Sequence, residues 1–105
     1  MKTTTKASKA SKQKYIVRCD RAGVFFGEIK ERNGNDVTMT NVRKIWYWDG
    51  ACAVEELAVN GVANPENCKL TVTVAEMTVM NPAQIIPCTA KATKSLGGCY
   101  EWKRG

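Results

Sequence analysis

Hydrophobic and polar residues alternate with a period of two along much of this chain, which is the pattern of β-strands with one buried face. The first such stretch covers 15–21, and its apolar side chains share one face: Tyr15, Val17 and Cys19. A second stretch covers 24–32 and contains Gly27, which inside a strand indicates strong curvature or a close backbone approach. The pattern therefore predicts two consecutive strands after the first fourteen residues.

A hairpin is predicted next, because the segment 33–36 reads Asn-Gly-Asn-Asp and both Asn and Gly tolerate positive φ. The returning strand covers 37–48. Its apolar residues occupy odd positions before Asn41 (Val37, Met39) and even positions after it (Val42, Trp46, Trp48). We therefore predict a bulge near Asn41 that switches the buried face of this strand.

The second half of the chain predicts two short helices and several further strands. One helix is predicted over 51–60, with Asp49 at its N-cap, Asn60-Gly61 at its end and a narrow apolar stripe of Val54, Leu57, Ala58 and Gly61. Thr89 is expected to cap a second helix that runs to Leu96. Strands are predicted at 70–74, 77–80, 85–86 and 99–102, with turns at 64–67 and 81–82.

These elements define the expected fold class. Five or six strands and two short helices without a βαβ rhythm predict a mainly β (α+β) protein, either a small curved antiparallel sheet or an SH3-like barrel. The length of 105 residues and the 44% share of hydrophobic residues fit one small domain. No stretch approaches the roughly 18 consecutive apolar residues of a membrane span, and no secretory signal is expected.

The charge is concentrated at the N-terminus. The formal net charge is +6, and residues 1–14 contribute five lysines and no acid: Lys2, Lys6, Lys9, Lys12 and Lys14. The other 91 residues carry 11 basic and 10 acidic side chains. Because residues 1–14 contain no large apolar side chain after Met1, we expect a disordered basic arm followed by one domain over 15–105. Such an arm either contacts phosphates without reading sequence or only aids solubility.

The sequence favours a protein that is not an enzyme and that holds no metal or cofactor. It has no histidine, and its five cysteines stand at 19, 52, 68, 88 and 99, without the close pairs of structural zinc sites. A catalytic thiol would need a neighbour that stabilises the thiolate, usually histidine. Glycine-rich phosphate-binding motifs are also missing from the sequence.

One run of residues is a candidate binding surface. In 43–48 (RKIWYW), alternation places Arg43 and Tyr47 on one face, and Trp46 and Trp48 on the other. We expect the two tryptophans to be core, which leaves Arg43 and Tyr47 exposed beside Arg18, Arg21 and Lys30 of neighbouring strands. An arginine beside an aromatic ring can hold a phosphate and stack a base, so these five residues are a candidate nucleotide or single-stranded nucleic-acid site. The alternative is an ordinary solvated sheet face.

Four blocks of the sequence resemble a family of small proteins encoded by tailed bacteriophages and prophages. The blocks are RAGVFFGEI (21–29), NVRKIWYWDGA (41–51), NCKLTV (67–72) and IIPCTAKATKSL (85–96), and the similarity covers about 15–103. That family carries no established activity. The resemblance implies a phage or bacterial origin, with a location in the bacterial cytoplasm or in the virion.

A second resemblance concerns 24–45, where an apolar–Gly–apolar strand, a turn and Met39-Thr40-Asn41 are similar to the first motif of Sm-like barrels. Proteins of that kind bind RNA in ring oligomers through an Asp and an Asn of the motif. Here Asp36 and Asn41 stand at a different separation. The resemblance therefore implies only a generic SH3-like barrel.

Three functions remain open from the sequence. The first is a phage-type accessory protein that binds nucleic acid or a nucleotide through the Arg/aromatic face, helped by the arm. The second is a protein-interaction module that inhibits a host defence or metabolic protein through apolar residues around 77–86. The third is a virion component whose arm contacts packaged DNA or a neighbouring subunit. In each case edge strands at 70–80 allow pairing with a second copy, and no membrane partner is expected.

Overall fold

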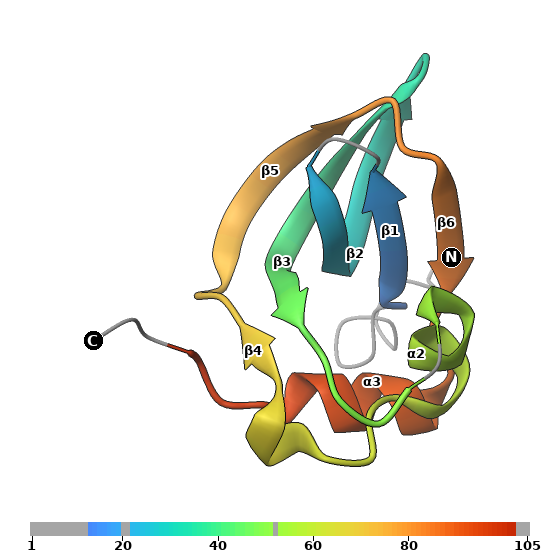
Figure 1. Ribbon diagram of the computed structural model, residues 1–105. Helices are drawn as coiled ribbons and strands as arrows, with labels where there is room; N and C mark the ends of the chain where they lie inside the picture. The colour runs from blue at the N-terminus through green and yellow to red at the C-terminus, as the bar shows by residue number, and fades with distance from the viewer. Residues whose placement is uncertain (1–12, 20–21, 52, 103–105) are drawn as a thin grey trace, which may run out of the picture.

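The computed structural model of the protein describes residues 13–19, 22–51 and 53–102, and it shows one curved antiparallel sheet with two short helices (Figure 1). The six strands are β1 (Tyr15–Cys19), β2 (Gly23–Asn33), β3 (Asp36–Tyr47), β4 (Lys69–Leu70), β5 (Val74–Met80) and β6 (Gln84–Pro87). The helices are α2 (Val54–Asn60) and α3 (Ala90–Gly97), and a 3-10 turn covers Pro65–Asn67. The predicted mainly β fold with a curved antiparallel sheet is confirmed.

The strands follow the order β4-β3-β2-β1-β6, and β5 also pairs with β3. Along one edge, β3 pairs with β5 over its first half and with β4 near its end. The strand predicted at 70–74 is therefore wrong in its middle, because the ladder is interrupted at 71–73 between β4 and β5. At this gap the Thr71 hydroxyl accepts a hydrogen bond from the Lys44 amide at 3.0 Å and replaces a ladder carbonyl.

The predicted bulge at Asn41 is confirmed. Phe26 pairs with Arg43 and Glu28 pairs with Thr40, so β3 carries one additional residue between these two pairs. Asn41 occupies the left-handed region with φ 47°. Gly27 lies opposite the bulge, where a Cβ atom would stand 2.8 Å from the Cα of Val42. The close backbone approach expected at Gly27 is present, and it allows β2 and β3 to bend together.

The bend gives the sheet two hydrophobic clusters, one on each side of β1 and β2. The first cluster lies between the sheet and the helices and includes Ile16, Phe26, Ile45, Leu57 and Leu96. The second lies where β3 and β5 curve over the opposite face, and it includes Val17, Phe25, Met39, Val42 and Val79. Because adjacent residues of a strand point to opposite faces, β1 and the first half of β2 are buried on both sides. Figure 1 shows the helices at one end of the sheet and the β2–β3 hairpin at the other.

Local signals set the helix ends, with one exception. The hydroxyl of Thr89 accepts a hydrogen bond from the Ala92 amide at 3.1 Å, which confirms the predicted cap of α3. α2 begins at Val54, later than predicted, and Asp49 does not cap it. The Asp49 carboxylate instead accepts a hydrogen bond from the Asn67 side chain at 3.0 Å, across the turn that precedes β4.

The C-terminal segment forms less regular structure than the predicted strand at 99–102. Its one bridge to the sheet within the described residues joins Leu70 and Glu101 in parallel orientation. No helix in the described part of the chain is long and apolar enough to cross a bilayer. The four described cysteines are free and buried: Cys19, Cys68, Cys88 and Cys99.

Candidate aromatic binding site

Arg43 is buried, which corrects the prediction of an exposed arginine. Only 8% of its surface is accessible. Its Nε donates to the carbonyl of Thr71 at 3.0 Å, and its Nη1 donates to the carbonyl of Cys99 at 2.7 Å. The reason is that the odd-numbered face of β3 after the bulge, which also carries Ile45, turns toward the helices rather than toward solvent.

The other described residues of the predicted Arg/aromatic face, Arg18, Lys30 and Tyr47, lie on three different strands. The Arg18 side chain donates to Gln84 on β6 at 2.8 Å. Lys30 forms an ion pair with Glu76 on β5 at 3.3 Å. Tyr47 is exposed, whereas Arg21 lies outside the described residues. The structure therefore does not assemble these side chains around a common site.

Of the five lysines expected to contact phosphate from the arm, only one lies in the described part of the chain. Lys2, Lys6, Lys9 and Lys12 lie outside the described residues. Lys14 packs on the sheet, where its ammonium group stands 3.1 Å from the Glu28 carboxylate and 5.9 Å from the centre of the Phe26 ring. Its carbonyl also accepts a hydrogen bond from the Cys88 amide at 2.8 Å. Lys14 therefore belongs to the folded body.

Trp46 is on the surface, which corrects its expected place in the core. It exposes 55% of its area. Ile45 pairs with Leu70 and Tyr47 pairs with Lys69, so Trp46 is an additional residue at a second irregularity of β3. A residue at such a position is left out of the ladder, and its direction is set by the bulge. Trp48 comes closer to the prediction, because it is half-buried against the cluster beside the helices.

Trp46 stacks on Trp102 in a near-parallel arrangement. The ring centroids are 5.0 Å apart and the ring planes differ by 8°. The ammonium group of Lys69 lies 5.2 Å from the Trp46 ring centre and 5.1 Å from that of Trp102, within the range of a cation–π contact. We refer to Trp46, Lys69 and Trp102 as the aromatic–lysine platform.

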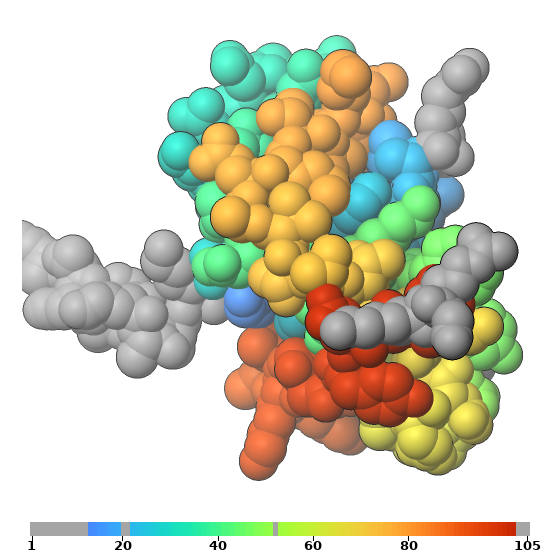
Figure 2. Space-filling model, turned by 90° about the vertical axis from the view of Figure 1, so that its left-hand side faces the viewer, coloured from blue at the N-terminus to red at the C-terminus, as the bar shows by residue number. Residues whose placement is uncertain are grey.

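Three segments that are distant in sequence build this platform. β3 supplies Trp46 near its end, and β4 supplies Lys69 beside it. Trp102 comes from the C-terminal segment, and its backbone amide donates to the carbonyl of Leu70 at 2.8 Å. In Figure 2, β5 (yellow to orange) lies on the face toward the viewer, above α3 and the segment that follows it (red).

The platform combines two indole rings with a positive charge at the surface. Exposed indole faces can stack on planar rings, and an ammonium group can accompany an anionic substituent of the same ligand. Periodicity predicts Trp46 in the core and does not mark Lys69 or Trp102 as site residues. Local periodicity gives no signal that positions 46, 69 and 102 meet, because a non-local strand pairing and an irregular terminal segment bring them together.

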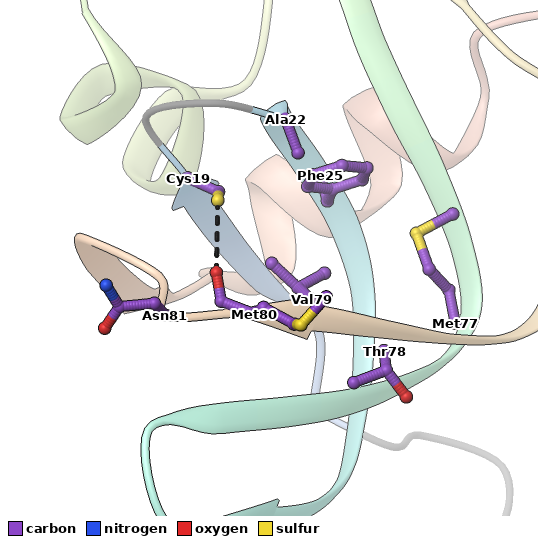
Figure 3. A pocket seen from close by; sticks show the side chains of 8 residues that line it. All are labelled: Cys19, Ala22, Phe25, Met77, Thr78, Val79, Met80 and Asn81. Carbon is purple, nitrogen blue, oxygen red and sulfur yellow. Dashed lines mark hydrogen bonds between the residues drawn. The ribbon is translucent and has the colours of Figure 1, made fainter.

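A groove lies on another part of the surface, between β5 and the ends of β1 and β2 (Figure 3). Its volume is about 430 Å³ and its lining includes Phe25, Met77, Val79 and Met80. The Cys19 thiol donates to the Met80 carbonyl at 3.3 Å and bridges the two walls (Figure 3). The lining is mainly apolar, and Met80 exposes 67% of its surface.

Two of the described cysteines have thiols whose pKa is raised. Burial raises the pKa of Cys88 to about 11 and also raises the pKa of Cys99, so both stay protonated near neutral pH. Within the described ranges, His, Cys, Asp and Glu side chains form no group of three or more that could hold a metal ion. The platform and the groove are candidate binding sites.

The fold and these surfaces define a small mainly β domain with an exposed aromatic–lysine platform. The chain belongs to the DUF6948 family, a domain of unknown function, whose family model matches residues 12–96. Trp46 and Lys69 lie within the matched residues, and Trp102 lies beyond them. No curated protein and no solved structure matches the chain significantly. The family match supports neither a phage origin nor an SH3-like barrel, so both stay predictions.

Proposed function

We propose that this protein is a non-enzymatic binding domain that takes single-stranded nucleic acid, or a nucleotide, on the aromatic–lysine platform. The observation that carries the proposal is the stack of the exposed Trp46 on the half-buried Trp102, with the Lys69 ammonium group beside both rings. The proposal keeps the ligand class expected from the sequence and moves the site away from Arg43 and Tyr47. An accessory role in a tailed phage rests on the sequence resemblance alone.

The physical basis of binding is stacking supplemented by charge. Stacking of a base on an aromatic side chain contributes about 1–3 kcal/mol and tolerates any base, because every base has a π-face. Lys69 can approach the phosphate of a stacked nucleotide, which makes the affinity decrease as the salt concentration rises. The lysines at positions 2, 6, 9 and 12 would add further salt-dependent affinity without sequence preference.

A titration of the full chain with oligothymidine, followed by tryptophan fluorescence, tests the proposal. Trp46→Ala is expected to lower the affinity by roughly 10- to 100-fold, since one stacking surface is lost. Tyr47→Ala is the matched variant: Tyr47 is the next residue, is exposed to a similar extent (52% against 55%) and lies outside the Trp46–Trp102 stack. Tyr47→Ala is expected to retain the affinity. A loss with Tyr47→Ala but not with Trp46→Ala would restore the face expected from the sequence.

The groove favours a second candidate function, binding of a host protein. Within the described residues β5 pairs only with β3, so one edge of β5 borders the groove without a strand partner. An extended segment with apolar side chains is the partner that such an edge and an apolar lining fit. Met80→Asp would then abolish co-purification of a host protein and leave oligothymidine binding intact, whereas Trp46→Ala would do the opposite.

A further inference from the structure

The buried Arg43 contacts both chain segments that bring Lys69 and Trp102 to Trp46. Thr71, whose carbonyl accepts from Nε at 3.0 Å, directly follows β4, the strand that carries Lys69. Cys99, whose carbonyl accepts from Nη1 at 2.7 Å, opens the segment that ends at Trp102. Arg43 itself stands three residues before Trp46 on β3. One guanidinium group therefore links the three parts of the platform.

We propose that Arg43 is a positioning residue that assembles the aromatic–lysine platform, an inference that builds on the function proposed above. By holding the Cys99 carbonyl against β3, Arg43 sets the path of the C-terminal segment so that Trp102 lies on Trp46. Arg43 touches no ligand in this scheme. It acts through the position of Trp102.

The weak attachment of the C-terminal segment gives this contact its importance. α3 ends at Gly97, and beyond it the described segment joins the sheet through one bridge, between Leu70 and Glu101, to which the hydrogen bond from the Trp102 amide belongs. Its other contacts are the burial of Cys99 beside the helices and a hydrogen bond from the Tyr100 hydroxyl to the Glu66 carbonyl at 3.3 Å. No strand ladder fixes its register. Hydrogen bonds from a charged donor are stronger than neutral ones, and the 2.7 Å bond from Arg43 is of this kind.

The geometry requires arginine rather than another long side chain. The planar guanidinium presents Nε and Nη1 in a fixed fork, so it reaches two carbonyls of different segments at once. A lysine at this position reaches one of them. A methionine fills a similar volume and reaches neither, and it would leave the carbonyls of Thr71 and Cys99 without this donor.

The Trp46–Trp102 stack provides a direct readout of Arg43. Two stacked indole rings 5.0 Å apart couple their electronic transitions, and a twist between the in-plane transition moments turns this coupling into an exciton couplet in the far-ultraviolet circular dichroism spectrum. The difference between the spectra of the parent and Trp102→Ala defines the couplet of the intact stack. The couplet reports the position of Trp102 independently of any ligand. Trp102→Ala defines the spectrum and the oligothymidine affinity of a protein without the stack.

The test compares Arg43→Met and Arg43→Lys with Arg32→Met, which removes the same charge from an exposed position on the β2–β3 hairpin. We expect Arg43→Met to lose the couplet and to bind oligothymidine as weakly as Trp102→Ala, roughly 10- to 100-fold below the parent. Arg43→Lys should fall between the two, and Arg32→Met should retain the couplet. The double variant Arg43→Met/Trp102→Ala should bind no more weakly than either single variant, because both remove the same contact.

A folded Arg43→Met protein that keeps the full couplet would overturn the inference. If Arg43→Met fails to fold, Arg43→Lys decides: a full couplet with lysine overturns the positioning role, and a reduced couplet supports it. A parent protein that shows the couplet, loses it in Arg43→Met and yet does not bind oligothymidine would uphold the role of Arg43 and refute the proposed function.

Discussion

The ammonium group of Lys14 lies 3.1 Å from the carboxylate of Glu28, and this ion pair joins the start of the described chain to the middle of β2. Glu28 is buried and also accepts hydrogen bonds from Thr40 at 3.0 Å and from Asn41 at 3.2 Å. The carboxylate thus connects Lys14, β2 and the bulge of β3.

The first prediction is that Glu28 makes the stability of the fold depend on acid pH. Burial alone would raise its pKa, but the contacts with Lys14, Thr40 and Asn41 together hold the pKa below the ordinary 4.5. A carboxyl whose pKa is lower in the folded state stabilises the fold above its unfolded pKa, and this contribution is lost as the pH falls through the folded value. Thermal unfolding followed between neutral pH and pH values below 4.5 should show the loss.

Glu28→Gln is the control for that pH dependence. The variant should be less stable at neutral pH by about 1–3 kcal/mol, because hydrogen bonds to a charged acceptor are weakened. Its stability should then decrease less than that of the parent as the pH is lowered. Equal decreases in both proteins would show that other carboxyl groups, not Glu28, account for the acid sensitivity.

The second prediction concerns Gly27, which lies on β2 opposite the bulge of β3, where the two strands bend together. Gly27→Ala would place a Cβ atom 2.8 Å from the Cα of Val42, a backbone atom that cannot move without shifting β3. We expect a loss of about 1–3 kcal/mol in the free energy of unfolding, measured by urea denaturation. Gly97→Ala is the matched control, since nothing lies within 4 Å of its added Cβ at the end of α3. A neutral Gly27→Ala variant would contradict the close approach.

The third prediction is that Trp46→Ala folds. Since Trp46 is exposed, its replacement removes mainly the stack with Trp102, which corresponds to about 0.5–1.5 kcal/mol. Phe26→Ala removes a ring that is 3% exposed in the cluster beside the helices, and it should cost about 3–5 kcal/mol. Chemical denaturation of both variants gives the comparison. A larger loss from Trp46 than from Phe26 would place Trp46 in the core after all.

The fourth prediction is that the Cys88 thiol is unreactive in the native protein. Burial raises its pKa from 9.0 to about 11, and the nearby Lys14 only partly opposes this shift. Because the thiolate is the nucleophile, alkylation by iodoacetamide at neutral pH should be slow at Cys88 in the folded protein and fast in denaturant. Peptide mapping by mass spectrometry measures the extent at each cysteine. Rapid native labelling of Cys88 would contradict its burial.

Elements that depend on neighbouring residues could be predicted from the sequence. The Gly34-Asn35 turn of the β2–β3 hairpin and the Thr89 cap of α3 follow from local backbone preferences, the bulge at Asn41 follows from the shift of the apolar positions along the strand, and each is present. The interruption at 71–73 could not be predicted in this way. The segment alternates like a continuous strand, and its break depends on contacts with β3 and Arg43.

The candidate site shows the same difference between features set by neighbouring residues and features set by distant contacts. Alternation along β3 predicts Arg43 and Trp46 on opposite faces, but alternation defines two faces without saying which one is buried. That choice depends on where the helices and β5 pack, and here the helices cover the side that carries Arg43. The sequence by itself therefore determined the first three strands, the hairpin turn between β2 and β3 and the position of the bend. Only the tertiary structure decided that the arginine lies inside and that Trp46, Lys69 and Trp102 meet at the surface, because contacts between distant segments, not local backbone preferences, set both.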